Sequence, residues 1–310
     1  MIKKFFLLSI VALQIIIYST SCSNIKSSPG DTVKAPEYSH KNNNSAKILE
    51  NYRELINKNA APNKIIKFLD ENIGNLSKDA VDNIVGDSLF SVLEKQQKNY
   101  EDKLFDNKFS EKIAECKIET LQNVNEIEDQ EVKLFVENIL KDGYKIYMAE
   151  GMYNLEIDYE LFNKKFASYC SEELSEYLVI MEAESIFHSY EDGGVIISWD
   201  DIAERIVTAE KYLNKYPDGK FYNNIKQIHS KFLSTYLLGT DNLPAFNYSD
   251  NEVNSGLLTS YKKTLIKYNE TSLADIINEY KYLIEISKYK KTAKIVNYAT
   301  EVSDFKNSIK

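Results

Sequence analysis

The sequence predicts an all-α protein, either a helical bundle or an irregular helical array. From Ala46 almost to the C-terminus, apolar residues recur at intervals of three and four, the spacing that places them on one face of a helix. Only 10 Gly and 5 Pro occur among 310 residues, so few positions interrupt a helix. A hydrophobic content of 43% is typical of a globular chain with a core to bury.

The first 22 residues have the three zones of a secretory signal. Lys3 and Lys4 form a basic start, a mostly apolar run extends from Phe5 to Tyr18, and small residues follow. As a helix, this run would span about 21 Å. A bilayer core is about 30 Å thick. We therefore expect residues 1–21 to be a cleaved signal peptide.

Cys22 directly follows Ser19, Thr20 and Ser21. This arrangement resembles the lipobox of bacterial lipoproteins, in which the signal is cut before the cysteine and the thiol carries diacylglycerol. The family usually has Leu three residues before the cysteine, where this chain has Ser19. The resemblance implies acyl chains such as palmitate attached through Cys22 and a mature protein on the extracytoplasmic face of the cell membrane. The alternative is cleavage after Ser21 and secretion.

Three regions follow the signal peptide. Residues 22–44 are polar and rich in Ser, Asn and Lys, which predicts a flexible tether. Residues 45–149 form a predicted N-terminal helical region, and residues 150–310 a C-terminal helical domain. We expect the joint between them at Glu150–Gly151.

Amphipathic helices are expected directly after the tether. Pro62 fits the first position of a helix, and Gly74 ends that helix. Ser77 is placed to cap the next helix. Apolar residues keep their spacing through the charged sequence that follows. A further helix is expected over 127–146, passing through Gly143.

Two short segments in the middle of the chain favour extended structure. They are 152–157 (MYNLEI) and 195–197, where β-branched residues follow a Gly pair. We expect them to pair as one very short two-stranded β element. Between them, Asp158 and Ser171 are placed to cap two helices.

A helical hairpin is predicted from Ser198 to Leu238. Ser198 and Asp201 form a capping box, and the turn Tyr216-Pro217-Asp218-Gly219 separates two helices. The sequence KYLNKYPDGKFY resembles the junctions of tetratricopeptide-type hairpins, although no second copy follows. The order EGMY, IDY, ISWDD and KYP within residues 150–300 resembles uncharacterised bacterial lipoproteins, which implies no function. Helices over 257–268, 273–286 and 293–305 complete the chain.

Charge excludes one class of partner. The net charge is −9, and loss of Lys3 and Lys4 with the signal makes it more negative. Nucleic-acid binding needs a basic surface, so no nucleic acid is expected as a partner. Attachment to anionic lipid by charge alone is also disfavoured. Cys116 and Cys170 have no metal-site spacing and are interpreted as core residues, although export would permit a disulfide.

No catalytic motif stands out. The sequence has no Gly-x-Ser-x-Gly elbow, no phosphate-binding Gly loop and neither HExxH nor CxxC. Glu184 and His188 have i, i+4 spacing, which suits a metal, but we interpret them as part of a solvated helix end. His229 is interpreted as a boundary residue with its polar edge outward. We therefore predict no catalytic residue, cofactor or metal.

One cluster of acidic and aromatic residues is the candidate binding patch. If the two extended segments pair, this patch would suit a cation, a sugar or a peptide. The alternative is a joint between helices, in which the aromatic rings pack and the acids cap helices. The patch consists of Tyr153, Glu156, Asp158, Tyr190, Asp192, Trp199 and Asp200.

The leading hypothesis is a non-catalytic, membrane-anchored interaction or scaffold module with an unknown envelope protein as partner. The second is a ligand-binding lipoprotein associated with a transporter or sensor, and the third is an extracytoplasmic hydrolase. A scaffold predicts a shallow groove and no deep pocket near Trp199, whereas a ligand binder predicts a closed cavity there.

Overall fold

A computed structural model describes residues 38–191 and 193–304, with side chains of 38–43 and Gln122 left aside. The chain divides into two units, Met1–Ser39 and His40–Lys310, and the second is described below. The predicted signal peptide, Cys22 and the tether up to residue 37 lie outside the described residues. Helix α1 spans Tyr38–Asn57. The predicted tether was therefore too long, since its residues 38–44 are helical.

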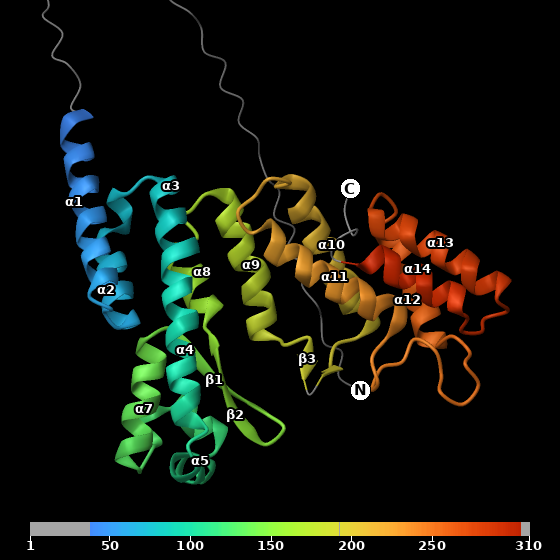
Figure 1. Cartoon of the computed structure of the whole chain (residues 1–310), viewed down its shortest axis with the longest axis horizontal. Helices are drawn as coiled ribbons and strands as arrows, with labels where there is room; N and C mark the ends of the chain where they lie inside the picture. The colour runs from blue at the N-terminus through green and yellow to red at the C-terminus, as the bar shows by residue number, and fades with distance from the viewer. Residues whose placement is uncertain (1–37, 192, 305–310) are drawn as a thin grey trace, which may run out of the picture. The chain divides into compact units, whose positions relative to one another are not determined.

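The predicted all-α class with a short β element is confirmed, because the described residues are mostly helical and contain two small two-stranded sheets (Figure 1). The first helices after α1 surround one hydrophobic core. They are α2 (Pro62–Asn72), α3 (Lys78–Val81), the π-helix η2 (Asp82–Leu89), α4 (Phe90–Leu104), α5 (Asn107–Ala114), α6 (Ile118–Gln122) and α7 (Gln130–Lys141), with short 3₁₀ turns η1 (Ile73–Asn75) and η3 (Val124–Glu126).

The helix predicted over 127–146 is wrong in its last turn. Helix α7 ends at Lys141, and strand β1 (Tyr144–Ala149) begins after Gly143, whose φ of +85° reverses the chain. A Cβ at Gly143 would lie 2.6 Å from Cζ of Phe162, so a side chain has no room there. The glycine that the sequence analysis placed inside a helix therefore terminates it.

The predicted pairing of the two extended segments is also wrong. Strand β2 (Met152–Ile157) pairs antiparallel with β1, and β3 (Tyr190–Glu191) pairs with β4 (Gly194–Val195). Each segment pairs with its immediate neighbour, because a tight turn closes at far lower entropic cost than a long loop. Glu150 and Gly151 form the β1–β2 turn, with φ of +54° and +74°. The predicted joint thus lies inside a hairpin, and the first core includes residues on both sides of it.

The remaining helices begin where the predicted caps lie. Asp158, Ser171 and Ser198 each accept a hydrogen bond from a backbone N–H of the first turn, and Ser198 with Asp201 forms the capping box. The helices are α8 (Tyr159–Phe166), α9 (Glu172–Ile186), α10 (Trp199–Lys215), α11 (Tyr222–Leu238), α12 (Ser255–Lys267), α13 (Ser272–Ile286) and α14 (Ala293–Ser303).

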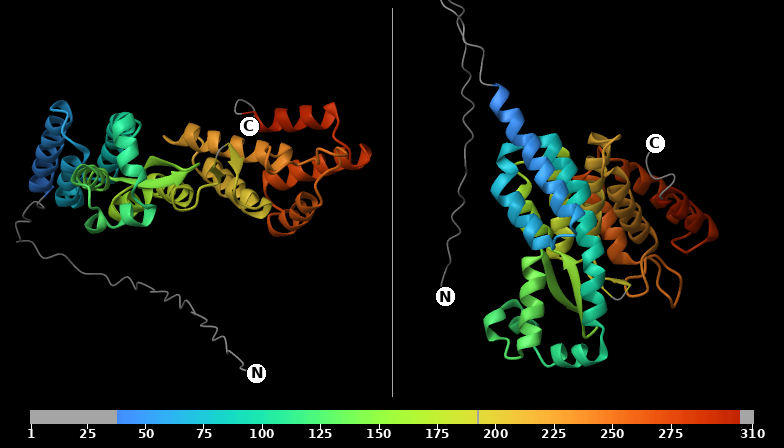
Figure 2. Two further views of the ribbon diagram at one scale, coloured as in Figure 1. Left: turned by 90° about the horizontal axis from the view of Figure 1, so that it is seen from below. Right: turned by 60° about the vertical axis from the view of Figure 1, so that its left-hand side comes forward.

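Helices α10 and α11 pack against each other and contribute to two cores (Figures 1 and 2). Tyr212 and Phe221, near their connecting turn, belong to the first core. Ile202 and Tyr236, at the opposite end, belong to a second core formed with α12, α13 and α14. Helices α10 and α11 therefore connect the first core, which includes the β1–β2 hairpin, to the second core of the C-terminal helices.

His229 on α11 differs from its predicted boundary position. Its side chain is only 3% exposed, and its Nδ1 has no hydrogen-bond partner among the described residues. Burial disfavours the charged imidazolium and lowers the pKa of His229 to about 4. The helix spacing placed this residue near the core, and the structure buries its side chain almost completely instead of leaving it at the boundary.

Stability should fall as the pH drops below 6.5, because the unfolded chain then binds a proton at His229 that the folded chain rejects. With a pKa of about 4 in the folded state and about 6.5 in the unfolded state, the expected loss between pH 7 and pH 5 is about 2 kcal/mol. Urea unfolding at both pH values measures it. The His229→Phe variant should lack this component, so an equal pH slope in both proteins would contradict the assignment.

Candidate functional site

The structure places the described residues of the predicted patch at several different positions. Tyr153 is buried, and its hydroxyl donates to the carbonyl of Cys116. Asp158 caps α8 by accepting from Leu161 N at 3.0 Å. The Trp199 ring is buried in the second core, 6.2 Å from the Tyr236 ring. Asp192 lies outside the described residues.

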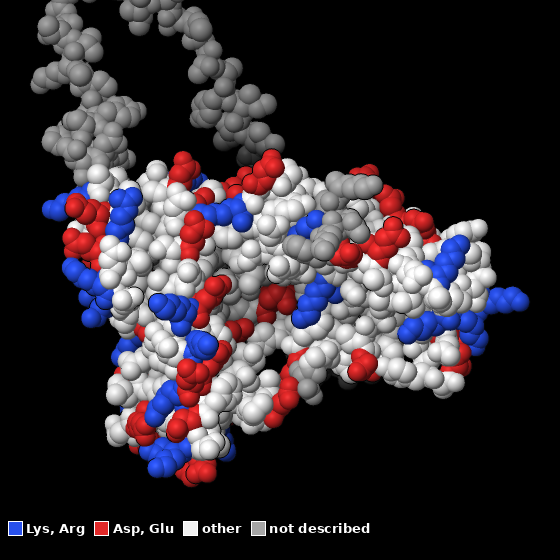
Figure 3. Space-filling model, viewed as in Figure 1, with Lys and Arg blue, Asp and Glu red and all other residues white. Residues whose placement is uncertain are grey.

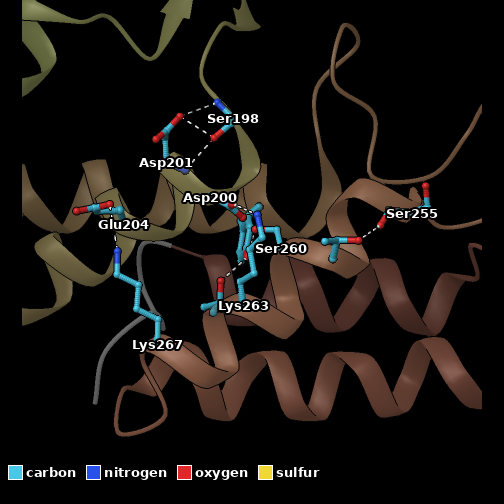
Figure 4. A network of polar contacts seen from close by, with 11 residues as sticks. Ser198, Asp200, Asp201, Glu204, Ser255, Ser260, Lys263 and Lys267 are labelled. Carbon is cyan, nitrogen blue, oxygen red and sulfur yellow. Dashed lines mark hydrogen bonds and ion pairs between the residues drawn. The ribbon is translucent and has the colours of Figure 1, made fainter. Parts of the chain in front are cut away.

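Asp200 belongs to an ion-pair network between α10 and α12 (Figure 4). Lys263 Nζ lies 2.5 Å from Asp200, and Lys267 Nζ lies 3.5 Å from Glu204. The hydrogen bond from Lys263 lowers the pKa of Asp200 below its usual range. All four side chains are largely exposed, so each pair contributes at most about 1 kcal/mol. Asp200 is thus engaged in holding α12 rather than free for a ligand.

An open groove of about 330 Å³ lies between α9, α10 and α11. Buried apolar side chains of Ile180, Ile197 and Phe232 line it. Exposed apolar side chains from α9 and its end add Val179 and Phe187. The remaining lining residues are Ala183, Glu184, Asp201, Glu204, Arg205, Thr208 and Ile228.

Helix α9 is apolar on two faces. Leu174, Tyr177 and Leu178 are buried in the first core. On other positions, Val179 is 51% exposed and Ile186 is 59% exposed, and Phe187 directly after the helix is 55% exposed. An apolar face of a helix normally packs against another part of the protein or against a partner. This unpartnered surface beside the groove was visible in the sequence YLVIMEAESIF, but it was not singled out there.

The charged groups of the groove are held in fixed positions. Arg205 forms an ion pair with Glu184 at 3.0 Å, and its Nη2 donates to the carbonyls of Ala183 and Phe187 at 3.1 and 3.2 Å. These carbonyls belong to the end of α9, where a cation is favoured by the helix dipole. Burial raises the pKa of Glu184, which also accepts a hydrogen bond from Ser189 Oγ. The groove therefore presents apolar surface around a neutralised ion pair.

A second, more polar pocket of about 240 Å³ lies beside the β1–β2 hairpin. It contains Tyr190, but Glu156 of the predicted patch lies behind it. His188 Nε2 lies 2.9 Å from both carboxylate oxygens of Glu156, and its ring lies 4.5 Å from that of Tyr147. Glu184 and His188 thus contact different partners, and the predicted solvated helix end is a packed joint instead.

The described residues contain neither a metal-binding cluster nor a disulfide. No group of three or more His, Cys, Asp or Glu among them is arranged to hold a metal ion. Cys116 and Cys170 are free thiols, and burial raises the pKa of Cys170 to about 12. Within the same part of the chain, no helix has the length and apolar content needed to cross a bilayer. No protein-family model, curated protein or solved structure matches this chain.

Proposed function

We propose that this chain is a membrane-anchored extracytoplasmic lipoprotein whose helical body acts as a non-catalytic interaction module. The anchor rests on the resemblance of Cys22 to a lipobox cysteine. The interaction role rests on one observation, the exposed apolar face of α9 beside the groove. Single exposed apolar residues are ordinary, but a contiguous set beside a concave surface is typical of a partner-binding site.

The occupant that fits the groove is a single amphipathic helix of a partner protein. Val179, Ala183 and Ile186 have the i, i+4, i+7 spacing that matches the apolar stripe of a second helix. Asp201 and Glu204 lie along the α10 side of the groove. Glu204 is paired with Lys267 at 3.5 Å and Arg205 with Glu184 at 3.0 Å, so Asp201 leaves this side acidic. A helix with Lys or Arg beside its apolar stripe would complement this acidic side.

Synthetic helices test the groove directly. We expect an amphipathic peptide of about 18 residues with Leu stripes and flanking Lys to bind at least about tenfold more tightly than its Glu-flanked counterpart. Fluorescence anisotropy with a labelled peptide measures both dissociation constants. Equal affinity of the two peptides, or no binding of either, would refute the groove as a binding site for a basic helix.

Two matched variants locate the binding site. Val179→Arg places a charge in the groove, and Ile266→Arg places one on α12 at another exposed apolar position. The first should abolish peptide binding, and the second should leave it unchanged. Equal effects of both substitutions would show that the peptide binds elsewhere.

The anchor has its own test, which does not depend on the groove. Cells expressing the full chain are grown with radiolabelled palmitate, and label on the protein is compared with that on a Cys22→Ala variant. Label should disappear in the variant. Label that persists would refute lipid attachment at Cys22 without affecting the groove.

A further inference from the structure

The pocket beside the β1–β2 hairpin is a second binding site, and we propose that it takes a small organic cation bearing a guanidinium or primary ammonium group. The inference does not rest on the groove. Its residues come from two parts of the chain, the hairpin and the segment that follows α9 (Figure 1). They are Tyr147, Met148, Ala149, Glu150, Met152, Asn154, His188, Tyr190 and Glu191.

Strand register explains how these residues come together. Tyr147 pairs with Asn154, and Lys145 pairs with Glu156, so all four lie on one face of the hairpin. The opposite face, with Ile146 and Leu155, is buried in the first core. The first face is therefore left for the segment after α9, which brings His188 onto it.

Charge selects a cationic ligand. Two carboxylates, Glu150 and Glu191, line the pocket, and neither Lys nor Arg does. Two bases lie close to the lining residues: Lys145 is paired with Glu156 at 3.1 Å, and Lys231 Nζ lies 3.5 Å from the centre of the Tyr190 ring. Burial raises the pKa of Tyr147, and the charges of Glu156, Glu101 and Glu191 add to this shift. Acidic side chains border the hollow beside the hairpin in Figure 3.

The residue types favour an organic cation over a metal ion. A metal needs several oxygen or nitrogen ligands directed at one point, and the described residues offer no such group of three. The Tyr147 ring offers an aromatic surface on which an ammonium or guanidinium can lie. Asn154 donates through Nδ2 to Met152 O at 3.1 Å, which leaves its Oδ1 as an acceptor. A volume of about 240 Å³ suits a small molecule or a single side chain.

His188 is held ready for the same ligand. Glu156 engages its Nε2, which fixes the ring orientation against Tyr147. The contacts with Glu156 and Tyr147 therefore fix the position of His188 in the pocket lining. Glu191 supplies the negative charge that attracts a cation.

Isothermal titration calorimetry with the full chain in detergent tests the proposal. Agmatine, which carries both cationic groups, should bind with a dissociation constant below about 1 mM. Glucose and CaCl₂ should give no binding. Binding of glucose or Ca²⁺ with equal affinity, or no heat with agmatine up to 10 mM, would overturn the proposal.

Matched variants place the ligand. Glu191→Gln should weaken agmatine at least fivefold, whereas Glu111→Gln, an exposed acid on α5, should not. Tyr147→Phe keeps the aromatic surface and should keep binding; Tyr147→Leu should lose it, with circular dichroism confirming the fold. Agmatine affinity unchanged in Glu191→Gln refutes the site even if Tyr147→Leu fails to fold.

The same head groups occur on free metabolites and on protein side chains. A second titration compares agmatine with a short, uncharged peptide that carries one internal Arg. Tighter binding of agmatine assigns a free small cation, and tighter binding of the peptide assigns a side chain of a partner protein. If Val179→Arg abolishes binding of both ligands and Glu191→Gln leaves it unchanged, the ligands bind in the groove. That result would refute the proposed pocket.

Discussion

Replacing Gly239 by alanine should lower the free energy of unfolding by at least about 3 kcal/mol, one of the largest effects expected for a single substitution in this chain. Gly239 follows α11 with φ of +76° and ψ of −171°, a conformation that is essentially confined to glycine. A Cβ there would lie 2.3 Å from Ala245 N and 2.5 Å from Leu243 O. Both are backbone atoms, so no side-chain rotation relieves the overlap.

Gly151 supplies the matched control. It also has a positive φ, +74°, but a Cβ there meets nothing within 4 Å. Gly151→Ala should therefore lower the free energy of unfolding by only about 1 kcal/mol, the cost of placing alanine in a left-handed backbone conformation. Urea unfolding of both variants, followed by circular dichroism, gives the comparison. Equal losses would mean that the close approach of Gly239 to the 243–245 backbone contributes nothing.

The Gly239 substitution should also weaken the groove. The loop after Gly239 carries Asn242, whose side-chain amide accepts from Val195 N at 3.0 Å and donates to Val195 O at 2.8 Å. Val195 lies two residues before Ile197, which lines the groove. A displaced loop would release β4 and the groove lining with it. Reduced binding of the Lys-flanked helix by Gly239→Ala, but not by Gly151→Ala, is the expected outcome.

Local signals allowed much of the fold to be predicted from sequence. The caps at Asp158 and Ser171 and the Ser198–Asp201 capping box each involve residues within three positions of one another. The turn between α10 and α11 was predicted from Pro217 and Gly219. Such features need no knowledge of distant contacts, and the structure contains each of them.

The errors arose where distant or competing contacts decide the outcome. Apolar spacing carried the predicted helix through Gly143, because the spacing contains no information about the close contact with Phe162. The two extended-prone segments, 152–157 and 195–197, were expected to pair with each other. In the structure 152–157 instead pairs with β1 across the Glu150–Gly151 turn. Burial of His229 depends on packing between helices, which no local pattern reports.

The candidate sites were predicted only in part. Tyr190 and Glu156 were chosen for clustering in sequence, and they do lie at or behind the hairpin pocket. Tyr147 was missed because strand β1 was not predicted, and Tyr147 directly follows the helix expected over 127–146. Trp199 was chosen as the only tryptophan, yet rarity carries no information about exposure, and its ring packs in the second core.

Glu210 was one of many acids in the sequence, and its replacement by alanine should cost about 3 kcal/mol. Its side chain is 4% exposed on α10. Oε1 accepts from Ser272 N at 2.7 Å, and Oε2 accepts from Leu273 N at 3.1 Å. These are the first two N–H groups of α13, which have no partner within their own helix. The carboxylate also opposes the positive end of the α13 dipole.

Two variants separate the charge from the hydrogen bonds and from ordinary surface effects. Glu210→Gln keeps one carbonyl oxygen, but its amide NH₂ group faces the second backbone N–H donor. Its free energy of unfolding should therefore lie between those of the wild type and Glu210→Ala. Glu204→Ala, on the same helix, removes only an exposed pair with Lys267 and should cost less than about 1 kcal/mol. Urea unfolding measures stability, and hydrogen exchange of the Ser272 and Leu273 amides measures local opening of α13. Similar losses for Glu204→Ala and Glu210→Ala, with no faster exchange at α13, would show that Glu210 does not hold this helix to α10.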